Sequence, residues 1–437
     1  MTATPPLTRT APLARLVTAL RGGPPDVAAH IEDTLAWLAR VEPYVRALLP
    51  EDGRRERLAA AVDALVDRFP AREDRPPLYG VPVGVKDIFA VEGLPTRAGS
   101  ALPPEEFAMP EGAAVRRLQA AGALVLGKTV TTEFAYFDPG ATTNPRDTAR
   151  TPGGSSSGSA AAVAAGIVPL AIGSQTVGSV IRPAAFCGIV GFKPTYGRIP
   201  TDGVLYYSPS VDHVGCFTQD IAGLRLAASV LLDGWTPPAP LGRAPVIGVP
   251  VGPYLDQVEP AAFAAFAETL VALTRAGVEV RRLPVLDDIT AINDRHRWLA
   301  TAEFGEQHAA RFKRYGSLYR AASAALFDAA REVTPEQRAE GLAGREALRV
   351  RLEAAATTEG IDAWAMPAAT GPAPVGLRST GDPAMNLPWT HAGLPAITIP
   401  AGAVEGMPLG LQLAGRFGGD EALIEVAARL EALLAAD

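Results

Sequence analysis

Two parts of the sequence repeat one local order: a short apolar strand, an amphipathic helix that ends at a glycine, and a second strand. The first lies in 78–93 and 112–130, where GAAVRRLQAAG precedes ALVLGKTV. The second lies in 244–252 and 260–284, where PAAFAAFAETLVALTRAG precedes VEVRRLP. A strand, a helix and a strand in this order form a crossover unit on a parallel or mixed sheet. The chain is therefore predicted to have an α/β fold.

Other segments add helices around this sheet. Residues 26–69 place apolar side chains at helical spacing and predict two or three helices. Residues 286–357 are rich in Arg, Ala and Glu without matching strands, which predicts an inserted or covering helical lobe. Residues 394–402 and 408–415 read as two strands, followed by a closing helix over 420–436.

Composition limits the function classes. The chain has 437 residues, 48% of them hydrophobic, which is enough for a large core. Its net charge of −7 argues against general binding to nucleic acid or to anionic membranes, which requires a basic surface. Two cysteines give no disulfide framework, and five histidines show no metal-ligand spacing. With neither a signal peptide nor an apolar span evident, we expect a cytoplasmic protein that uses no metal or cofactor.

A stretch rich in glycine and serine, TPGGSSSGS, continues directly into the apolar AAAVAAG within 151–166. This composition suits a flexible linker, a phosphate-binding loop, a catalytic loop at a helix N-terminus, or a structural turn without chemistry. The apolar continuation argues against a solvated linker, and no lysine follows at the spacing of a phosphate-binding loop. Local composition alone does not decide among the four.

Two further features accompany this stretch. A second Gly/Ser loop, GSQTVGSVIRPAAFCGIVGFKPTYGRIP, occupies 173–200 between apolar segments. Upstream, Lys86 ends the apolar run GVPVGVK. A buried lysine has a lowered pKa and can act as a base. The alternative is a surface lysine whose apolar stem alone is covered.

Taken together, the motifs GVPVGVKD, LGKTVTTEFA, TPGGSSSGSAAAVAAG, GSQTVGSVIRPAAFCGIVGFKPTYGR and NLPWTHAGLPAITIP appear in the order typical of the amidase signature family. The chain resembles that family over most of 78–220 and 360–437, whereas 235–360 carries no comparable motif. The resemblance implies a large mixed β-sheet core covered by helices on both faces, with a helical covering lobe.

The resemblance also suggests how the chain is divided. An N-terminal helical region over 1–77 would pack on a signature core over 78–235. A variable α/β and helical region over 236–359 would shape the substrate site. Strands and a helix over 360–437 would complete the core.

The family uses a Ser–cisSer–Lys triad, which falls on Lys86, Ser155 and Ser179. Ser179 would be the nucleophile, and Ser155, following a cis peptide bond, would pass its proton to Lys86. Backbone N–H groups would stabilise the oxyanion. The residues that would supply them are Thr176, Val177, Gly178 and Ser179.

The second loop departs from the family pattern. Gln175 stands in place of an aspartate, Val177 in place of a glycine and Ile181 in place of an arginine. The aspartate and the arginine are lost together, which leaves no stranded charge and is consistent with an active enzyme. Val177 would narrow the substrate site. Arg182, one residue after the missing arginine, is either a structural clamp or a contact for an anionic group of the substrate.

The helical region over 286–357 also carries five aromatic residues. Their spacing is helical, so it suits packing in a core as well as an apolar entrance to the substrate site. These residues are Trp298, Phe304, Phe312, Tyr315 and Tyr319.

The function implied is hydrolysis of C–N acyl bonds in small-molecule amides and carbamates (urethanes), with side esterase activity. The pattern leaves two alternatives: a glutamine-dependent amidotransferase component of the A type, or a catalytically silent binding protein. No nucleic-acid or membrane partner is expected, and the sequence leaves the oligomeric state open.

Overall fold

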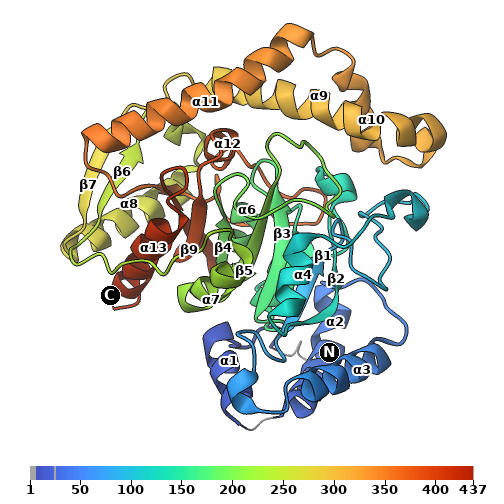
Figure 1. Ribbon diagram of the computed structural model, residues 1–437. Helices are drawn as coiled ribbons and strands as arrows, with labels where there is room; N and C mark the ends of the chain where they lie inside the picture. Colours follow the sequence, from blue (N-terminus) through green and yellow to red (C-terminus); the bar gives the residue numbers. More distant parts are fainter. Residues whose placement is uncertain (1–5, 24–25, 437) are drawn as a thin grey trace.

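The computed structural model describes residues 6–23 and 26–436 and is built on one large mixed sheet (Figure 1). Ten strands follow the order β2-β1-β3-β5-β4-β9-β10-β8-β6-β7. Helices cover both faces, and 13 α-helices lie in the described ranges. The predicted α/β class and the mixed sheet with helices on both faces are confirmed.

The first end of the sheet is parallel. Strand β1 (Pro82–Lys86) pairs in parallel with β2 (Leu124–Thr129) on one side and with β3 (Leu170–Gln175) on the other. Helix α4 (Ala113–Ala120) connects β1 to β2, which confirms the first crossover unit. The C-terminal ends of β1 and β3 lie at the same edge because the two strands run in the same direction.

The middle of the sheet is antiparallel. Beyond β3 follow β5 (His213–Thr218), β4 (Val190–Lys193), β9 (Ala396–Val404), β10 (Met407–Ala414) and β8 (Ala363–Pro367), and each pair in this series is antiparallel. The pairing of β4 with β9 joins the first half of the chain to the C-terminal segment. The two strands predicted near the C-terminus are therefore central strands.

The second end of the sheet is parallel again. Strand β6 (Val246–Pro250) pairs with β8 and with the edge strand β7 (Glu279–Leu283). Helix α8 (Pro260–Arg275) connects β6 to β7 and confirms the second crossover unit. No residue of β7 is fully buried, as befits an edge strand.

The central strands send alternate side chains into two cores, one on each face. In β2, Leu124 and Leu126 belong to one core, whereas Val125 between them belongs to the other. In β3, Ala171 belongs to the core that contains Leu124, whereas Leu170 belongs to the core that contains Val125. This alternation is the two-residue period of a strand buried on both sides.

Separate groups of helices cover the two faces. The core that contains Leu124 also holds apolar side chains from α2 (Val27–Val45) and α3 (Arg54–Arg68), the two helices predicted over 26–69. On the other face, α7 (Ile221–Leu231) packs against α1 (Leu13–Gly22) and α13 (Asp420–Leu434).

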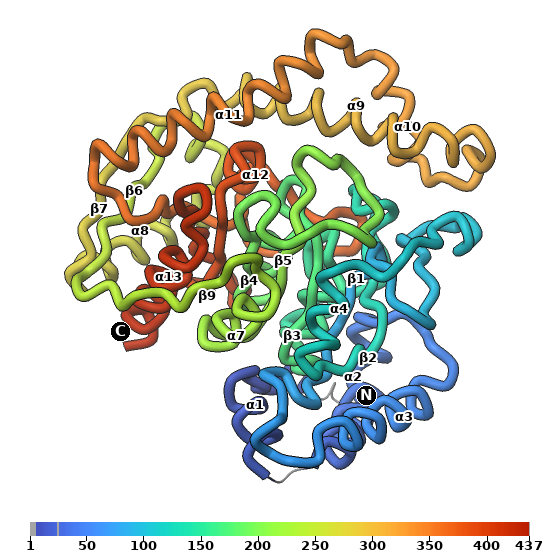
Figure 2. The backbone as a smooth tube through the Cα atoms, in the orientation of Figure 1, coloured from blue at the N-terminus to red at the C-terminus, as the bar shows by residue number. Residues whose placement is uncertain are grey.

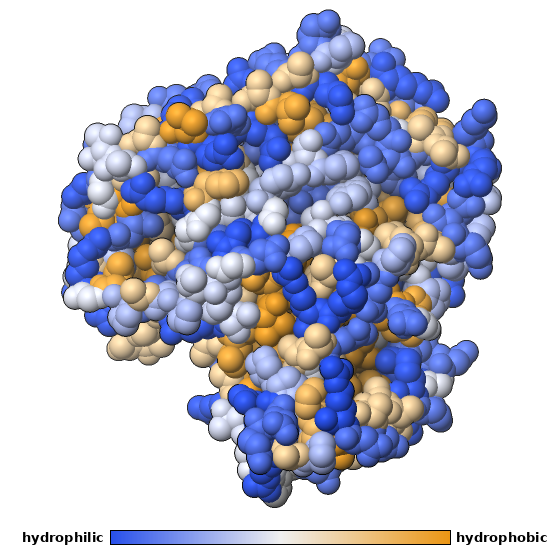
Figure 3. All heavy atoms as spheres, viewed as in Figure 1, coloured by the Kyte–Doolittle hydropathy of each residue, from blue (hydrophilic) through white to orange (hydrophobic). Residues whose placement is uncertain are grey.

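A helical arm extends over one edge of the sheet (Figure 2). Helix α9 (Ile289–Tyr315) runs outward, α10 (Ala321–Ala330) lies near the tip, and α11 (Pro335–Thr358) returns beside α9 to β8. Thr334 and Gln337 form a capping box at the start of α11. These helices confirm the predicted covering helical lobe. On the face of the molecule shown in Figure 3, hydrophilic residues predominate. In the described ranges, every helix is too short or too polar to cross a membrane.

Candidate active site

Lys86 is the last residue of β1 and is completely buried. Its Nζ donates hydrogen bonds to Ser155 Oγ at 2.7 Å and to Ser174 Oγ at 2.8 Å. The alternative of a surface lysine is therefore wrong. Both partners of the amine are hydroxyl groups, which can donate as well as accept a proton.

The electrostatic environment brings Lys86 close to neutrality. Burial lowers its pKa from 10.5 to about 7, and the negative charge of Asp212 partly offsets this effect. Asp212 is itself buried; burial raises its pKa to about 6, opposed by hydrogen bonds from the hydroxyl of Thr176 and from the backbone N–H groups of Ser208 and Tyr207. A substantial fraction of the Lys86 side chains is therefore unprotonated near pH 7.

The glycine- and serine-rich stretch is part of the core. Every residue of 151–166 is buried, so the linker interpretation is wrong. The peptide bond between Gly154 and Ser155 is cis. Helix α5 (Ser157–Ala164) starts two residues later and is buried on all sides. The loop therefore places Ser155 just before a buried helix and beside the end of β1.

The two serines that follow Ser155 hold the loop. Ser156 Oγ donates to the carbonyl of Ser174 at 3.2 Å, and Ser157 Oγ donates to the carbonyl of Gly153 at 2.8 Å. These bonds tie the loop to β3 through Ser174 and close the turn that precedes α5 through Gly153. The three adjacent serines thus have different partners, and only Ser155 contacts the lysine amine.

Ser179 lies in the segment between β3 and α6 (Ile181–Cys187) and is 8% exposed. It shares a pocket of about 30 Å³ with Ser155 and Arg182. Within the described residues, no hydrogen bond joins the hydroxyls of Ser155 and Ser179. The remaining lining residues are Ala135, Tyr136, Phe137, Thr176, Val177, Gly178, Tyr207 and Pro383.

Aromatic side chains form one wall of this pocket. The ring of Tyr136 stacks on Tyr207 with centroids 5.8 Å apart, and Phe304 from α9 packs against both rings. None of the five aromatic residues considered for an apolar entrance lines the pocket itself. Phe304 supports the wall from behind, in keeping with the alternative of packing in a core.

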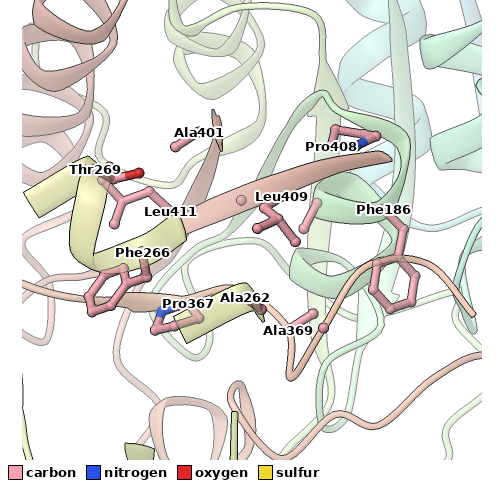
Figure 4. A pocket seen from close by; sticks show the side chains of 13 residues that line it. Phe186, Ala262, Phe266, Thr269, Pro367, Ala369, Ala401, Pro408, Leu409 and Leu411 are labelled. Atoms are coloured by element: carbon pink, nitrogen blue, oxygen red, sulfur yellow. The ribbon is translucent and has the colours of Figure 1, made fainter. Parts of the chain in front are cut away.

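Two other cavities contain none of the three predicted triad residues. The pocket in Figure 4 lies between α8, β10 and the end of α6, and Thr269 is the one polar side chain among its lining residues. A groove of about 650 Å³ in the helical arm contains none of the three predicted triad residues. The small pocket beside Ser179 is therefore the candidate active site.

The contacts of Gln175 show how the chain replaces the aspartate and the arginine of the family pattern. It is completely buried at the end of β3. Its Oε1 accepts hydrogen bonds from the backbone N–H groups of Val180 at 2.8 Å and Ile181 at 2.9 Å. These groups begin α6 and have no partner within the helix. A neutral amide therefore caps the helix here without a counterion.

Arg182 contacts the loop that carries Ser155. Its Nη2 donates to the carbonyl of Gly154 at 2.7 Å and to the hydroxyl of Thr380 at 3.1 Å, as a structural clamp would. Burial lowers its pKa to about 10, and Asp382 opposes this effect. Among the described residues, its Nε and Nη1 have no hydrogen-bond partner.

Two further titratable residues, Cys187 and His213, are buried in the core. Cys187 is buried at the end of α6, and burial raises the pKa of its thiol to about 12. His213 starts β5, and its Nδ1 contacts the carbonyl of Val211. In residues 6–23 and 26–436, no group of three histidine, cysteine, aspartate or glutamate side chains could hold a metal ion.

Sequence reasoning missed three residues near the site: Ser174, Asp212 and Thr390. Ser174 sits in a buried strand, where a serine carries no signal of its own. Asp212 and Thr390 contact the segment that carries Ser179, and both come from parts of the chain that are distant in the sequence. The stretch TDGVLYYSPSVDHVG contains Asp212, but its pattern does not reveal a partner.

The comparisons with known proteins identify the family of this chain. The sequence matches the family described as amidase over residues 32–424. The chain belongs to this family, and it is an amidase-signature hydrolase.

Individual relatives differ in their named activities. The A-type component of a glutamyl-tRNA(Gln) amidotransferase from Chloroflexus aggregans is 33% identical, with 91% of each chain covered. A solved amidase structure has a TM-score of 0.88 at 32% identity and covers 97% of this chain and 100% of its own. A 6-aminohexanoate cyclic dimer hydrolase has a TM-score of 0.83 at 25% identity, with 97% of each chain covered.

Proposed function

We propose that this protein hydrolyses C–N acyl bonds of small-molecule amides, and of carbamates (urethanes), through Lys86, Ser155 and Ser179. The observation that carries the proposal is the 2.7 Å hydrogen bond between Lys86 and Ser155, made by a buried amine whose pKa is about 7. Ser179 lines the same pocket. A base, a relay hydroxyl and a second hydroxyl are the parts that serine-based acyl transfer requires.

In the proposed reaction, neutral Lys86 takes the proton of Ser155 as Ser155 takes the proton of Ser179. Ser179 Oγ forms a bond to the acyl carbon, and the carbonyl oxygen becomes an oxyanion. The proton returns through Ser155 to the leaving nitrogen when the C–N bond breaks. Water then repeats the sequence on the acyl ester of Ser179 and releases the acid.

Backbone N–H groups of the nucleophile segment are proposed to hold the oxyanion. Thr176 is included on the family pattern. In the described residues, the N–H groups of Val177, Gly178 and Ser179 donate to no protein acceptor, and all three residues line the pocket. Free donors that are fixed before the reaction stabilise developing negative charge.

The substrate is proposed to be shaped by three features. Val177 narrows the pocket, and Tyr136 and Tyr207 form an apolar wall. Arg182, with two unpartnered N–H groups among the described residues, is proposed to bind an acceptor or anionic group of the substrate in addition to clamping Gly154. Because Phe304 packs on this wall, we also propose that the region 236–359 shapes the site.

A glutamine-dependent amidotransferase component remains the second candidate. The observation that favours it is the 33% identity to the A-type component from Chloroflexus aggregans. Such a protein would release ammonia from glutamine for a partner to use. The departures at Gln175, Val177 and Ile181 favour a self-contained hydrolase instead.

The test is hydrolysis of a small panel by the wild type and by Ser179→Ala. The panel holds an aryl amide, an aryl carbamate, a matched ester, a short aliphatic amide and glutamine. We expect the wild type to cleave at least one amide or carbamate and Ser179→Ala to cleave none. Cleavage of glutamine alone would instead favour the amidotransferase component. No cleavage, or full activity of Ser179→Ala, would overturn the proposal.

A further inference from the structure

Side chains from outside the segment that carries Ser179 bind its backbone. Residues 176–180 belong neither to β3 nor to α6. The carbonyls of Gly178 and Val180 accept hydrogen bonds from the N–H groups of Arg182 and Ala184, but these bonds do not involve the peptide between Val177 and Gly178. Gln175 binds the far end of the segment through the N–H groups of Val180 and Ile181. The peptide in the middle, between Val177 and Gly178, is held by a different element.

That element is α12 (Leu387–His391), through the buried side chain of Thr390. Its hydroxyl accepts a hydrogen bond from Gln175 Nε2 at 2.9 Å and donates to the carbonyl of Val177 at 2.7 Å. A hydroxyl has one hydrogen and two lone pairs, so both contacts form together. The alternative acceptor, the carbonyl of Asn386, is farther away at 3.1 Å.

The direction of the Val177 carbonyl determines the direction of a proposed oxyanion donor. The carbonyl of Val177 and the N–H of Gly178 belong to one planar trans peptide, so they point in opposite directions. Val177 and Gly178 line the pocket, whereas Thr390 does not. Drawing the carbonyl toward Thr390 therefore turns the Gly178 N–H away from α12.

Tight packing leaves the peptide no room to shift toward α12. A Cβ atom at Gly178 would lie 2.3 Å from Asn386 Oδ1, so the loop already contacts this helix region closely. Gln175 suits this arrangement because one side chain supplies both an acceptor and a donor. An ionised carboxylate at 175 could accept from the backbone but could not donate to Thr390.

We propose that Thr390 and Gln175 are positioning residues, which aim the Gly178 N–H at the oxyanion. This inference rests on the proposed function, because it assigns these residues a part in the same reaction. They touch no reacting atom in this scheme, and they act on the transition state rather than on substrate binding. Their loss should therefore lower kcat more than it raises KM.

The experiment compares Thr390→Val, Thr390→Ser and Thr398→Val on the panel substrate that the wild type cleaves best. Thr398 is a matched control, since it is buried in β9 and its hydroxyl has no partner among the described residues. Loss of a direct oxyanion donor costs about 10²- to 10³-fold in kcat. For a misdirected donor we expect Thr390→Val to lose ~10- to 100-fold in kcat with little change in KM. Thr390→Ser should restore most of kcat, and Thr398→Val should match the wild type.

Other outcomes overturn the inference. Equal kcat for Thr390→Val and Thr398→Val, a change confined to KM, or a loss that Thr390→Ser does not restore would each contradict it. Gln175→Glu, which keeps the acceptor for Val180 and Ile181, should add little to Thr390→Val in a double-mutant cycle, and full additivity would also contradict the coupling.

A second variant covers the case in which Thr390→Val does not fold. Gln175→Glu keeps an acceptor for Val180 and Ile181 but, when ionised, has no N–H for Thr390. It should fold and lose kcat, and unchanged kcat overturns the inference. The Ser179→Ala comparison tests the proposed function separately, because it does not depend on the outcome at Thr390.

Discussion

Lys86 at the end of β1 and Lys193 at the end of β4 are alike in burial but not in partners. Both are completely buried, and burial lowers the pKa of each to about 7. The amine of Lys86 contacts two hydroxyls, whereas that of Lys193 donates to the carbonyls of Pro194 and Leu394. A neutral amine has two N–H groups, so Lys193 can satisfy both carbonyls without a positive charge.

The difference shows that burial and a lowered pKa do not by themselves mark a base. Carbonyl oxygens only accept hydrogen bonds, so the partners of Lys193 have no proton to transfer to it. In the proposed mechanism, the hydroxyl of Ser155 gives its proton to Lys86 and receives another from Ser179. The chemical nature of the partner therefore separates the proposed catalytic lysine from a structural one.

The largest effect should come from removing the two amines in turn. Lys86→Met should lower kcat/KM by roughly 10³-fold or more, because no other base among the described residues contacts the Ser155 hydroxyl. Lys193→Met should keep activity within about threefold, since it changes no proposed proton-transfer step. Steady-state kinetics on the best panel substrate measures both, with circular dichroism to confirm folding. An equal loss in the two variants would remove the distinction between the two lysines.

A smaller effect is expected when the relay hydroxyl is compared with its neighbour. Ser155→Ala should lower kcat by about 10²- to 10⁴-fold, the range for loss of a proton-transfer group. Ser157→Ala removes one hydrogen bond to Gly153 and should cost about 1 kcal/mol of unfolding free energy. Its kcat should stay near that of the wild type. If Ser157→Ala proved as inactive as Ser155→Ala, the loop would be sensitive as a whole and the relay would lose its support.

The pH dependence should distinguish the two lysines further. Neutral Lys86 is the proposed base, so kcat/KM should fall as pH decreases through about 7, where the amine becomes protonated. Asp212→Asn removes a negative charge that favours protonated Lys86, so the midpoint should move to lower pH. Lys193→Met should leave the midpoint in place. A midpoint that moves upward in Asp212→Asn would contradict the assignment.

The sequence predicted the parts of the fold that local pattern controls. Periodicity and composition predicted the apolar run that ends at Lys86, the apolar segment after the serines, both crossover units and the helical arm. The contacts that complete the candidate site were not. Thr390 and Gln175 are 215 residues apart, and pairing between β4 and β9 brings their segments together. Periodicity within a segment contains no information on which distant segment will pair with it.

The smallest effect on activity is expected for Lys193→Met. The pH dependence of its unfolding free energy is the more sensitive measurement for this variant. Unfolded Lys193 has a pKa near 10.5 but a folded pKa of about 7, so between these values the unfolded chain binds more protons. Stability therefore rises with pH across this window. From pH 7 to 9 the wild type should gain up to about 2 kcal/mol more unfolding free energy than Lys193→Met.

Urea unfolding at the two pH values measures this difference. Burial also lowers the pKa of Lys86 and of Lys128, so both make the free energy of unfolding depend on pH. Their contributions cancel in this difference, because both residues are present in the wild type and in the variant. An equal gain in the two proteins would show that Lys193 keeps its charge when folded. The charge would then be stabilised by the two carbonyl oxygens and by the nearby Asp420. Lys86 and Lys193 would in that case differ in pKa as well as in hydrogen-bond partners.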